Sequence, residues 1–168
     1  MLLLMAESSP KSRIRILVAF LILIAGYAIF LQYYNYNPGF NDATLADLRK
    51  ENAAKIVDIA KSEYDIDLDY SPESIKKVDQ ILAQMHREHL EKPFSEDQVM
   101  KRSILWGSYV GEVVRSNVSC EWRATIGLPL QLDDETYLYP TDWCHQKIVD
   151  GGEENHLWTR YLFATTGN

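Results

Sequence analysis

The residues that could do chemistry in this 168-residue chain are few and scattered. Glu112 and Arg115 interrupt the apolar run 104–114 three positions apart, which places them on one face of a helix. An acid in so apolar a helix is either held in a structural ion pair by the arginine or is a perturbed carboxylate beside a pocket. Tyr109 of the same run and Trp122 just beyond it complete this candidate site.

The only two cysteines, Cys120 and Cys144, both follow the one long apolar run of the chain. An even count in an oxidising compartment predicts a disulfide. Closing a loop of about 25 residues would contribute roughly 3 kcal/mol in the chain-entropy model. Two buried free thiols and a metal-binding pair are the alternatives.

No metal or cofactor is predicted. The acids Asp65, Asp67 and Asp69 open like an EF-hand calcium loop, but Tyr70 stands where that loop needs glycine and Lys76 where it needs the bidentate glutamate. The histidines also lack a metal-binding pattern, because His86 and His89, one helical turn apart, have no third ligand fixed by spacing.

Motifs for catalysis are equally thin. The chain has no nucleophile elbow, Gly-rich phosphate loop, zinc motif or Cys-x-x-Cys pair. We therefore predict a protein that is not an enzyme. A hydrolase built on Glu112 or His145 is the alternative that the sequence leaves open.

Residues 16–31 are uniformly apolar, and the usable span, 14–34, is about 20 residues, the length of a transmembrane helix. Lys11, Arg13 and Arg15 precede it, so the positive-inside rule places the 1–13 tail in the cytoplasm and the rest of the chain outside. The predicted location is a bacterial inner membrane, crossed once, with a periplasmic domain. A cleaved signal peptide and a buried helix of a soluble protein are the alternatives.

A linker at 35–43 leads to one domain at 44–168, a size that supports its own core. After the apolar run there are 14 basic and 23 acidic residues, a net charge of −9. This balance disfavours nucleic acid or anionic lipid as a partner and is compatible with a basic protein or with simple solubility.

Helical spacing of apolar residues predicts helices at 44–64 and 72–90, the first either packed on the domain or lifting it as a stalk. Ser71 is the expected N-cap of the second helix. Ser95 with Gln98 forms a capping box that opens a third, central helix. Alternating residues predict short strands at 119–126, 130–132 and 136–139, followed by a helical segment at 140–149. The last apolar run, 156–163, is either a strand or a helix, and we favour the helix. The expected fold is α+β, with about three helices packed on a small antiparallel sheet.

The Gly-x-Tyr-x-Gly-Glu-x-x-Arg pattern from Gly107 to Arg115, followed by Trp122, resembles an uncharacterised family of small bacterial α+β domains. The resemblance covers residues 54–150. It implies the fold and no established activity. The chain departs from the pattern by placing Cys120 just before the tryptophan and by adding the membrane span.

Together these features predict a membrane-anchored periplasmic module that binds another protein. An immunity protein that blocks a basic exported toxin is its most specific form, because acidity would steer it toward a basic active site. The alternative is an accessory subunit or assembly factor of an inner-membrane complex.

Overall fold

A computed structural model of the protein describes residues 40–152 and 156–166. The predicted cytoplasmic tail, the membrane span and most of the linker lie outside these residues. Within the described part of the chain, none of the helices has both the length and the apolar character needed to cross a bilayer.

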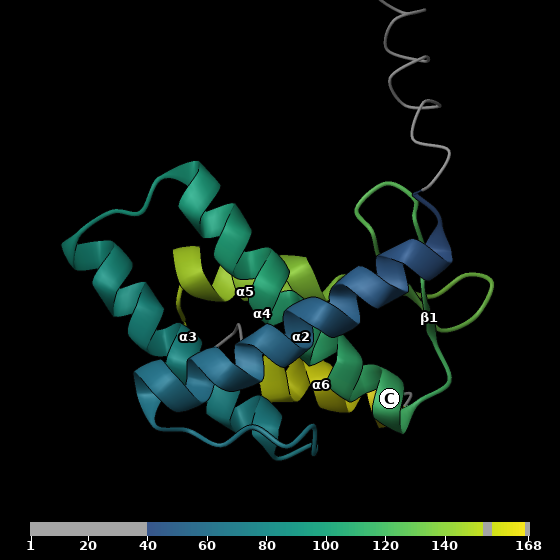
Figure 1. The fold of residues 1–168 in the computed structure, drawn as a ribbon, viewed down its shortest axis with the longest axis horizontal. Helices are drawn as coiled ribbons and strands as arrows, with labels where there is room; N and C mark the ends of the chain where they lie inside the picture. The colour runs from purple at the N-terminus through teal and green to yellow at the C-terminus, as the bar shows by residue number, and fades with distance from the viewer. Residues whose placement is uncertain (1–39, 153–155, 167–168) are drawn as a thin grey trace, which may run out of the picture. The chain divides into compact units, whose positions relative to one another are not determined.

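The domain is α+β, with five helices and a three-stranded antiparallel sheet in the described residues (Figure 1). The five helices correspond to the five helical segments expected along the chain, although only about three were expected to pack on the sheet, and the strands are only two residues long. The elements, in chain order, are α2 (Asp42–Tyr64), α3 (Ser74–Glu91), α4 (Glu96–Asn117), β1 (Glu121–Trp122), β2 (Leu130–Gln131), β3 (Tyr137–Leu138), α5 (Pro140–Val149) and α6 (Leu157–Thr166).

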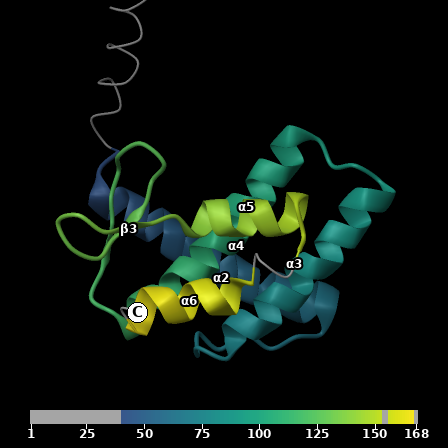
Figure 2. The same cartoon turned by 180° about the vertical axis from the view of Figure 1, so that it is seen from behind.

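Helix α4 lies at the centre, with α2 packed on one side and α5 on the other (Figure 2). The predicted capping box is confirmed: Ser95 Oγ accepts the Gln98 N–H, and the Gln98 side chain accepts the Ser95 N–H. Beyond it the helix is apolar around most of its circumference, which is typical of a helix inside a core. At Gly107 a Cβ would overlap the backbone of Thr141, so this glycine permits the close approach of α5.

Helix α2 packs along α4 and β1, so its apolar stripe belongs to the core and not to a free stalk. Asn41 caps it, accepting the Thr44 N–H while Thr44 Oγ1 accepts the Asn41 N–H. Its buried face includes a charge: Arg49 donates to Ile104 O (3.3 Å) and Ser108 Oγ (3.2 Å). Desolvation lowers the pKa of this guanidinium.

The entry to α3 differs from prediction. The helix begins at Ser74 and not at Pro72, and Ser71 supplies its carbonyl to the Ser74 N–H in a tight turn. The Ser71 hydroxyl does not cap the helix, because it donates to Asp69 Oδ1 (2.7 Å). Two of the three acids that resemble the start of a calcium loop, Asp65 and Asp67, form ion pairs with Lys61.

The sheet has the order β1-β2-β3, with Trp122 opposite Leu130 and Leu130 opposite Leu138. The predicted strand at 119–126 ends after Trp122. Arg123 still donates its backbone N–H across to Pro129 O (2.9 Å), and beyond it the Ala124 N–H donates to Asp42 at the start of α2 (2.6 Å), which also pairs with Arg123 Nη1 (2.8 Å). Ile126, at the end of the predicted strand, lies exposed in the loop.

Helices α5 and α6 close the domain over α3. Asp79 of α3 joins them: its carboxylate accepts the Leu157 N–H at the start of α6 (3.1 Å) and pairs with buried Lys147 of α5 (3.4 Å). His156 lies 3.1 Å from the same carboxylate. The predicted final helix at 156–163 is therefore confirmed, with an acid from another helix at its N-terminus, where negative charge is stabilising.

Candidate functional site

The structure brings three of the four predicted site residues together. Arg115 Nη1 donates to both carboxylate oxygens of Glu112, at 2.9 and 3.0 Å. Trp122 Nε1–H donates to Glu112 Oε1, which also accepts from Arg115, at 2.8 Å. Both oxygens of the acid are thus engaged, and its bonds tie strand β1 to α4. The arrangement is that of an ion pair that also accepts the indole N–H.

The indole of Trp122 is enclosed on both faces. One side packs against Gly111 of α4, where a Cβ would overlap the ring. On the other, the guanidinium of Arg49 lies 4.7 Å from the ring centroid, a cation–π contact. Within the described residues no carboxylate pairs with this arginine. The indole therefore serves as the junction of α2, α4 and the sheet.

Tyr109 does not join this cluster. Its hydroxyl donates to Ser74 Oγ (2.8 Å) and accepts the Tyr70 N–H (3.0 Å), and its ring lies 5.0 Å from that of Tyr70. Burial raises the pKa of the phenol, although these hydrogen bonds oppose the shift. The residue fixes the entry to α3.

The predicted Cys120–Cys144 disulfide is absent, and both cysteines are free thiols. Cys144 is fully buried in α5, with Arg160, Asp79 and Arg49 as its charged neighbours. Cys120 is half-buried beside Arg115 and Glu112. The sheet and α5 thus place the two thiols in different surroundings. Burial raises the pKa of Cys120 to about 11 and raises that of Cys144 as well, so both are held as thiols.

His86 and His89 each contact a backbone group. His86 Nδ1 is 3.0 Å from Ile148 O, and His89 Nδ1 accepts the Phe94 N–H at 3.0 Å. Residues 40–152 and 156–166 contain no group of three or more His, Cys, Asp or Glu side chains placed to hold a metal ion.

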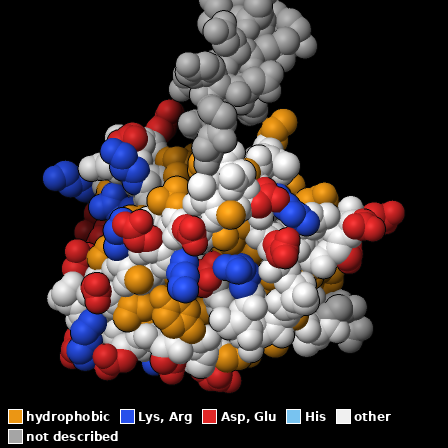
Figure 3. Space-filling model, turned by 45° about the vertical axis from the view of Figure 1, so that its right-hand side comes forward, with side chains coloured by type: hydrophobic (Ala, Val, Ile, Leu, Met, Phe, Trp, Pro, Cys, Tyr) orange, Lys and Arg blue, Asp and Glu red, His pale blue; other side chains and the backbone are white. Residues whose placement is uncertain are grey.

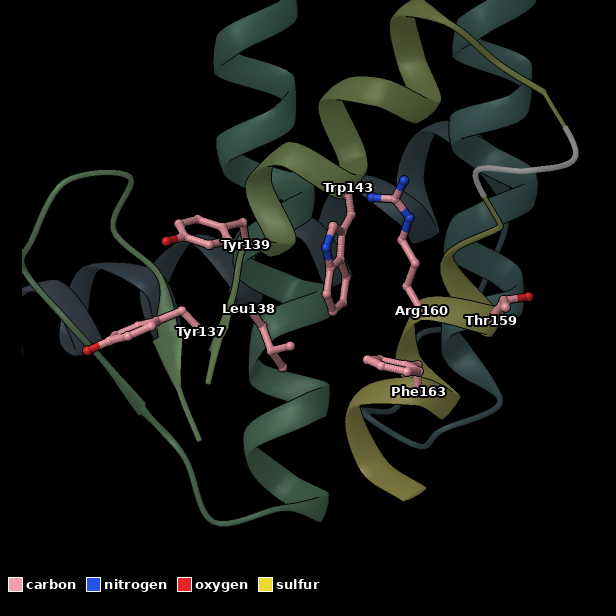
Figure 4. Close-up of a pocket in the computed structure, with 7 residues that line it drawn as sticks. All are labelled: Tyr137, Leu138, Tyr139, Trp143, Thr159, Arg160 and Phe163. Atoms are coloured by element: carbon pink, nitrogen blue, oxygen red, sulfur yellow. The ribbon is translucent and has the colours of Figure 1, made fainter. Parts of the chain in front are cut away.

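A different region has the geometry of a binding site. A pocket of about 410 Å³ opens between β3, α5 and α6 (Figure 4). We call it the aromatic pocket; its lining residues are Tyr137, Leu138, Tyr139, Trp143, Thr159, Arg160 and Phe163.

The side chains of the aromatic pocket are only partly covered. The indole of Trp143 lies between Leu138 on one side and Arg160 and Phe163 on the other (Figure 4). Phe163 is 67% exposed. The guanidinium of Arg160 donates to Gln146 Oε1 (2.6 Å), which fixes its position at the edge. Aromatic rings and an arginine around an apolar hollow are the residue types that dominate protein-binding sites.

Sequence reasoning missed this pocket as a site. In the predicted strand 136–139, Leu138 is buried whereas Tyr137 and Tyr139 are exposed. Trp143 and Phe163, however, come from helices twenty residues apart in the chain, and no spacing signal predicts that they meet.

Comparison with protein-family models, curated proteins and solved structures finds no match to the chain. The functional argument therefore depends on the residues themselves.

Proposed function

We propose that the chain is a membrane-anchored, extracytoplasmic protein-binding module and that the aromatic pocket receives an apolar side chain of its partner. The pocket is the observation that carries this proposal. The pocket is lined mainly by apolar and aromatic side chains. A contiguous apolar surface that stays exposed to water on a folded domain usually marks an interaction site. The anchor is the apolar span predicted at 14–34.

The partner is a basic protein. The chain after the span carries a net charge of −9, and exposed acids flank the lining residues: Glu135 precedes Tyr137 by two positions, and Asp142 precedes Trp143. Such a field raises the association rate with a positively charged partner. Arg160 is the cation among the lining residues and keeps its charge, because the Gln146 side chain to which it donates is neutral; the chain after the span is nevertheless strongly acidic.

An exported toxin that acts in the periplasm, blocked by this module, is the most specific form of the proposal. Its catalytic surface would be basic and would place an apolar residue next to Trp143. The small, acidic and membrane-anchored character of the chain suits an immunity protein that meets such a toxin as it arrives.

Site-specific photo-crosslinking in the native membrane tests this proposal. The photoreactive residue benzoylphenylalanine replaces Phe163 in one variant and Leu90 in a matched control, because both side chains are about equally exposed, at 67% and 68%. Leu90 lies at the end of α3, on another element.

We expect one exported protein with a basic isoelectric point to crosslink at position 163 and not at position 90, and the yield to fall steeply with added salt. Crosslinks from position 163 to integral membrane subunits would instead identify an accessory component of a membrane complex. Equal crosslinking at both positions would overturn the assignment of the pocket.

A further inference from the structure

A second apolar feature lies in the loop between β1 and β2. Ile126 is 82% exposed, the largest exposure among the large apolar side chains of the described residues. A turn presents it: the Leu128 N–H donates to Thr125 O, and both Gly127 and Leu128 have positive φ, at 82° and 48°. A non-glycine residue in this region is strained, so the turn is held in place by its surroundings.

The loop is fastened to the point where the described chain begins. Asp42, in the first turn of α2, accepts the Ala124 N–H (2.6 Å) and the Arg123 Nη1–H (2.8 Å). Figure 1 shows the loop beside the first turn of α2. Phe40, immediately before that helix, is 38% exposed. Two exposed apolar residues thus share one end of the domain.

Chain length sets how far this end can be from a membrane. Only five residues separate Tyr34, the last residue of the predicted span, from Phe40. Even fully extended, they reach about 20 Å. The domain must therefore approach the bilayer with the end that carries Phe40 and the loop.

The charge of the loop suits this placement. Residues 123–132 contain no acid, although the chain after the span is strongly acidic. Arg123 is neutralised by Asp42, and Tyr139, whose ring lies against Gly127, adds an aromatic group of the type found at membrane interfaces. Acids and bases are interspersed with apolar atoms over the face seen in Figure 3. The segment 123–132 differs because it contains no acid, and it therefore offers a local site for lipid contact.

We propose that Ile126 and Phe40 rest in the interfacial region of the bilayer and hold the domain in a fixed orientation. The inference rests on the membrane anchor of the proposed function. Because Tyr139 both backs the loop and lines the aromatic pocket, the orientation sets the height of that pocket above the lipid. A partner would then be received close to the membrane surface.

Depth-dependent fluorescence quenching tests the proposal on the full chain in vesicles of phosphatidylethanolamine and phosphatidylglycerol. An NBD fluorophore is attached at Ile126→Cys or, as the matched control, at Leu90→Cys, which is 68% exposed at the end of α3. The unsubstituted chain, treated alike, reports any labelling of its own buried or half-buried cysteines. Circular dichroism verifies that each variant folds.

We expect lipids spin-labelled near the headgroup to quench position 126 at least about twofold more than position 90, with a blue-shifted emission at 126. A blue shift without lipid quenching would mean that protein covers Ile126, either a second copy or residues 33–39, and would overturn the proposal. Water-like emission at 126 would overturn it as well. Flotation of the same vesicles separates the two ideas: a chain that fails to float has no anchor, whereas a floating chain with unquenched Ile126 refutes the interfacial contact alone.

Discussion

The indole of Trp122 occupies the space that Gly111 leaves on the surface of α4. Two residues eleven positions apart, one in a helix and one in a strand, therefore depend on each other's size. The glycine is unfavourable to the helix by itself, by about 1 kcal/mol relative to alanine, so its presence is explained by the ring that lies against it.

Gly111→Ala is expected to destabilise the protein by about 2 kcal/mol, because overpacking a filled core outweighs the gain in helix propensity. Urea unfolding of the full chain in detergent, followed by tryptophan fluorescence, measures the effect. The sign of the change in the free energy of unfolding is decisive, because helix propensity alone would make the variant more stable than the parent. Combining the change with Trp122→Phe, which removes part of the ring, should recover some of the loss.

Glu112→Gln should lower the free energy of unfolding by about 1 kcal/mol, because it removes the charge that Arg115 meets but keeps an oxygen for the indole N–H. Glu112→Ala should cost about 2 to 3 kcal/mol, since the buried indole donor of Trp122 then has no acceptor. The same urea titration compares the two variants. Equal losses would mean that the bond to the indole contributes nothing.

Signals confined to one turn of helix were readable from the sequence. Ser95 and Gln98 are three residues apart and meet whatever the rest of the chain does. Asn41 and Thr44 carry a capping signal of the same kind, which the predicted start at residue 44 overlooked.

Contacts between distant segments were not readable. Arg49 appears in the sequence as one of many charges on an Ala-, Lys- and Glu-rich helix, and only the packing of α2 on α4 buries it over Trp122. Asp42 binds the start of the β1–β2 loop from a position about 80 residues earlier. The aromatic pocket has the same character, because three separate elements supply its walls. Alternation and helical spacing describe one helix or strand at a time and cannot predict which side chains of different elements come into contact.

The two cysteines should resist alkylation in the folded protein. With its pKa raised to about 11, Cys120 is thiolate to roughly one part in a thousand at about pH 8, and Cys144 is fully buried. Mass spectrometry after iodoacetamide treatment should find neither modified in the native protein and both modified in denaturant without reductant. Protection that persists in denaturant until a reductant is added would show that a disulfide forms after all.

Stability should fall at acid pH through Asp42. Its pKa is lowered first by the Ala124 N–H and then by Arg123, so its contribution is complete above the unfolded pKa, about 4, and disappears as the pH falls through the folded value. Because the side chain is 46% exposed, Asp42→Asn should cost less than about 1 kcal/mol at neutral pH. The stabilities of the variant and the parent should converge as the pH falls through the folded pKa of Asp42. Asp47→Asn, which removes an exposed charge from the same helix but neither of these bonds, should show no such convergence. A difference between parent and Asp42→Asn that persists at low pH would mean that packing, and not the carboxylate's charge, holds the loop to α2.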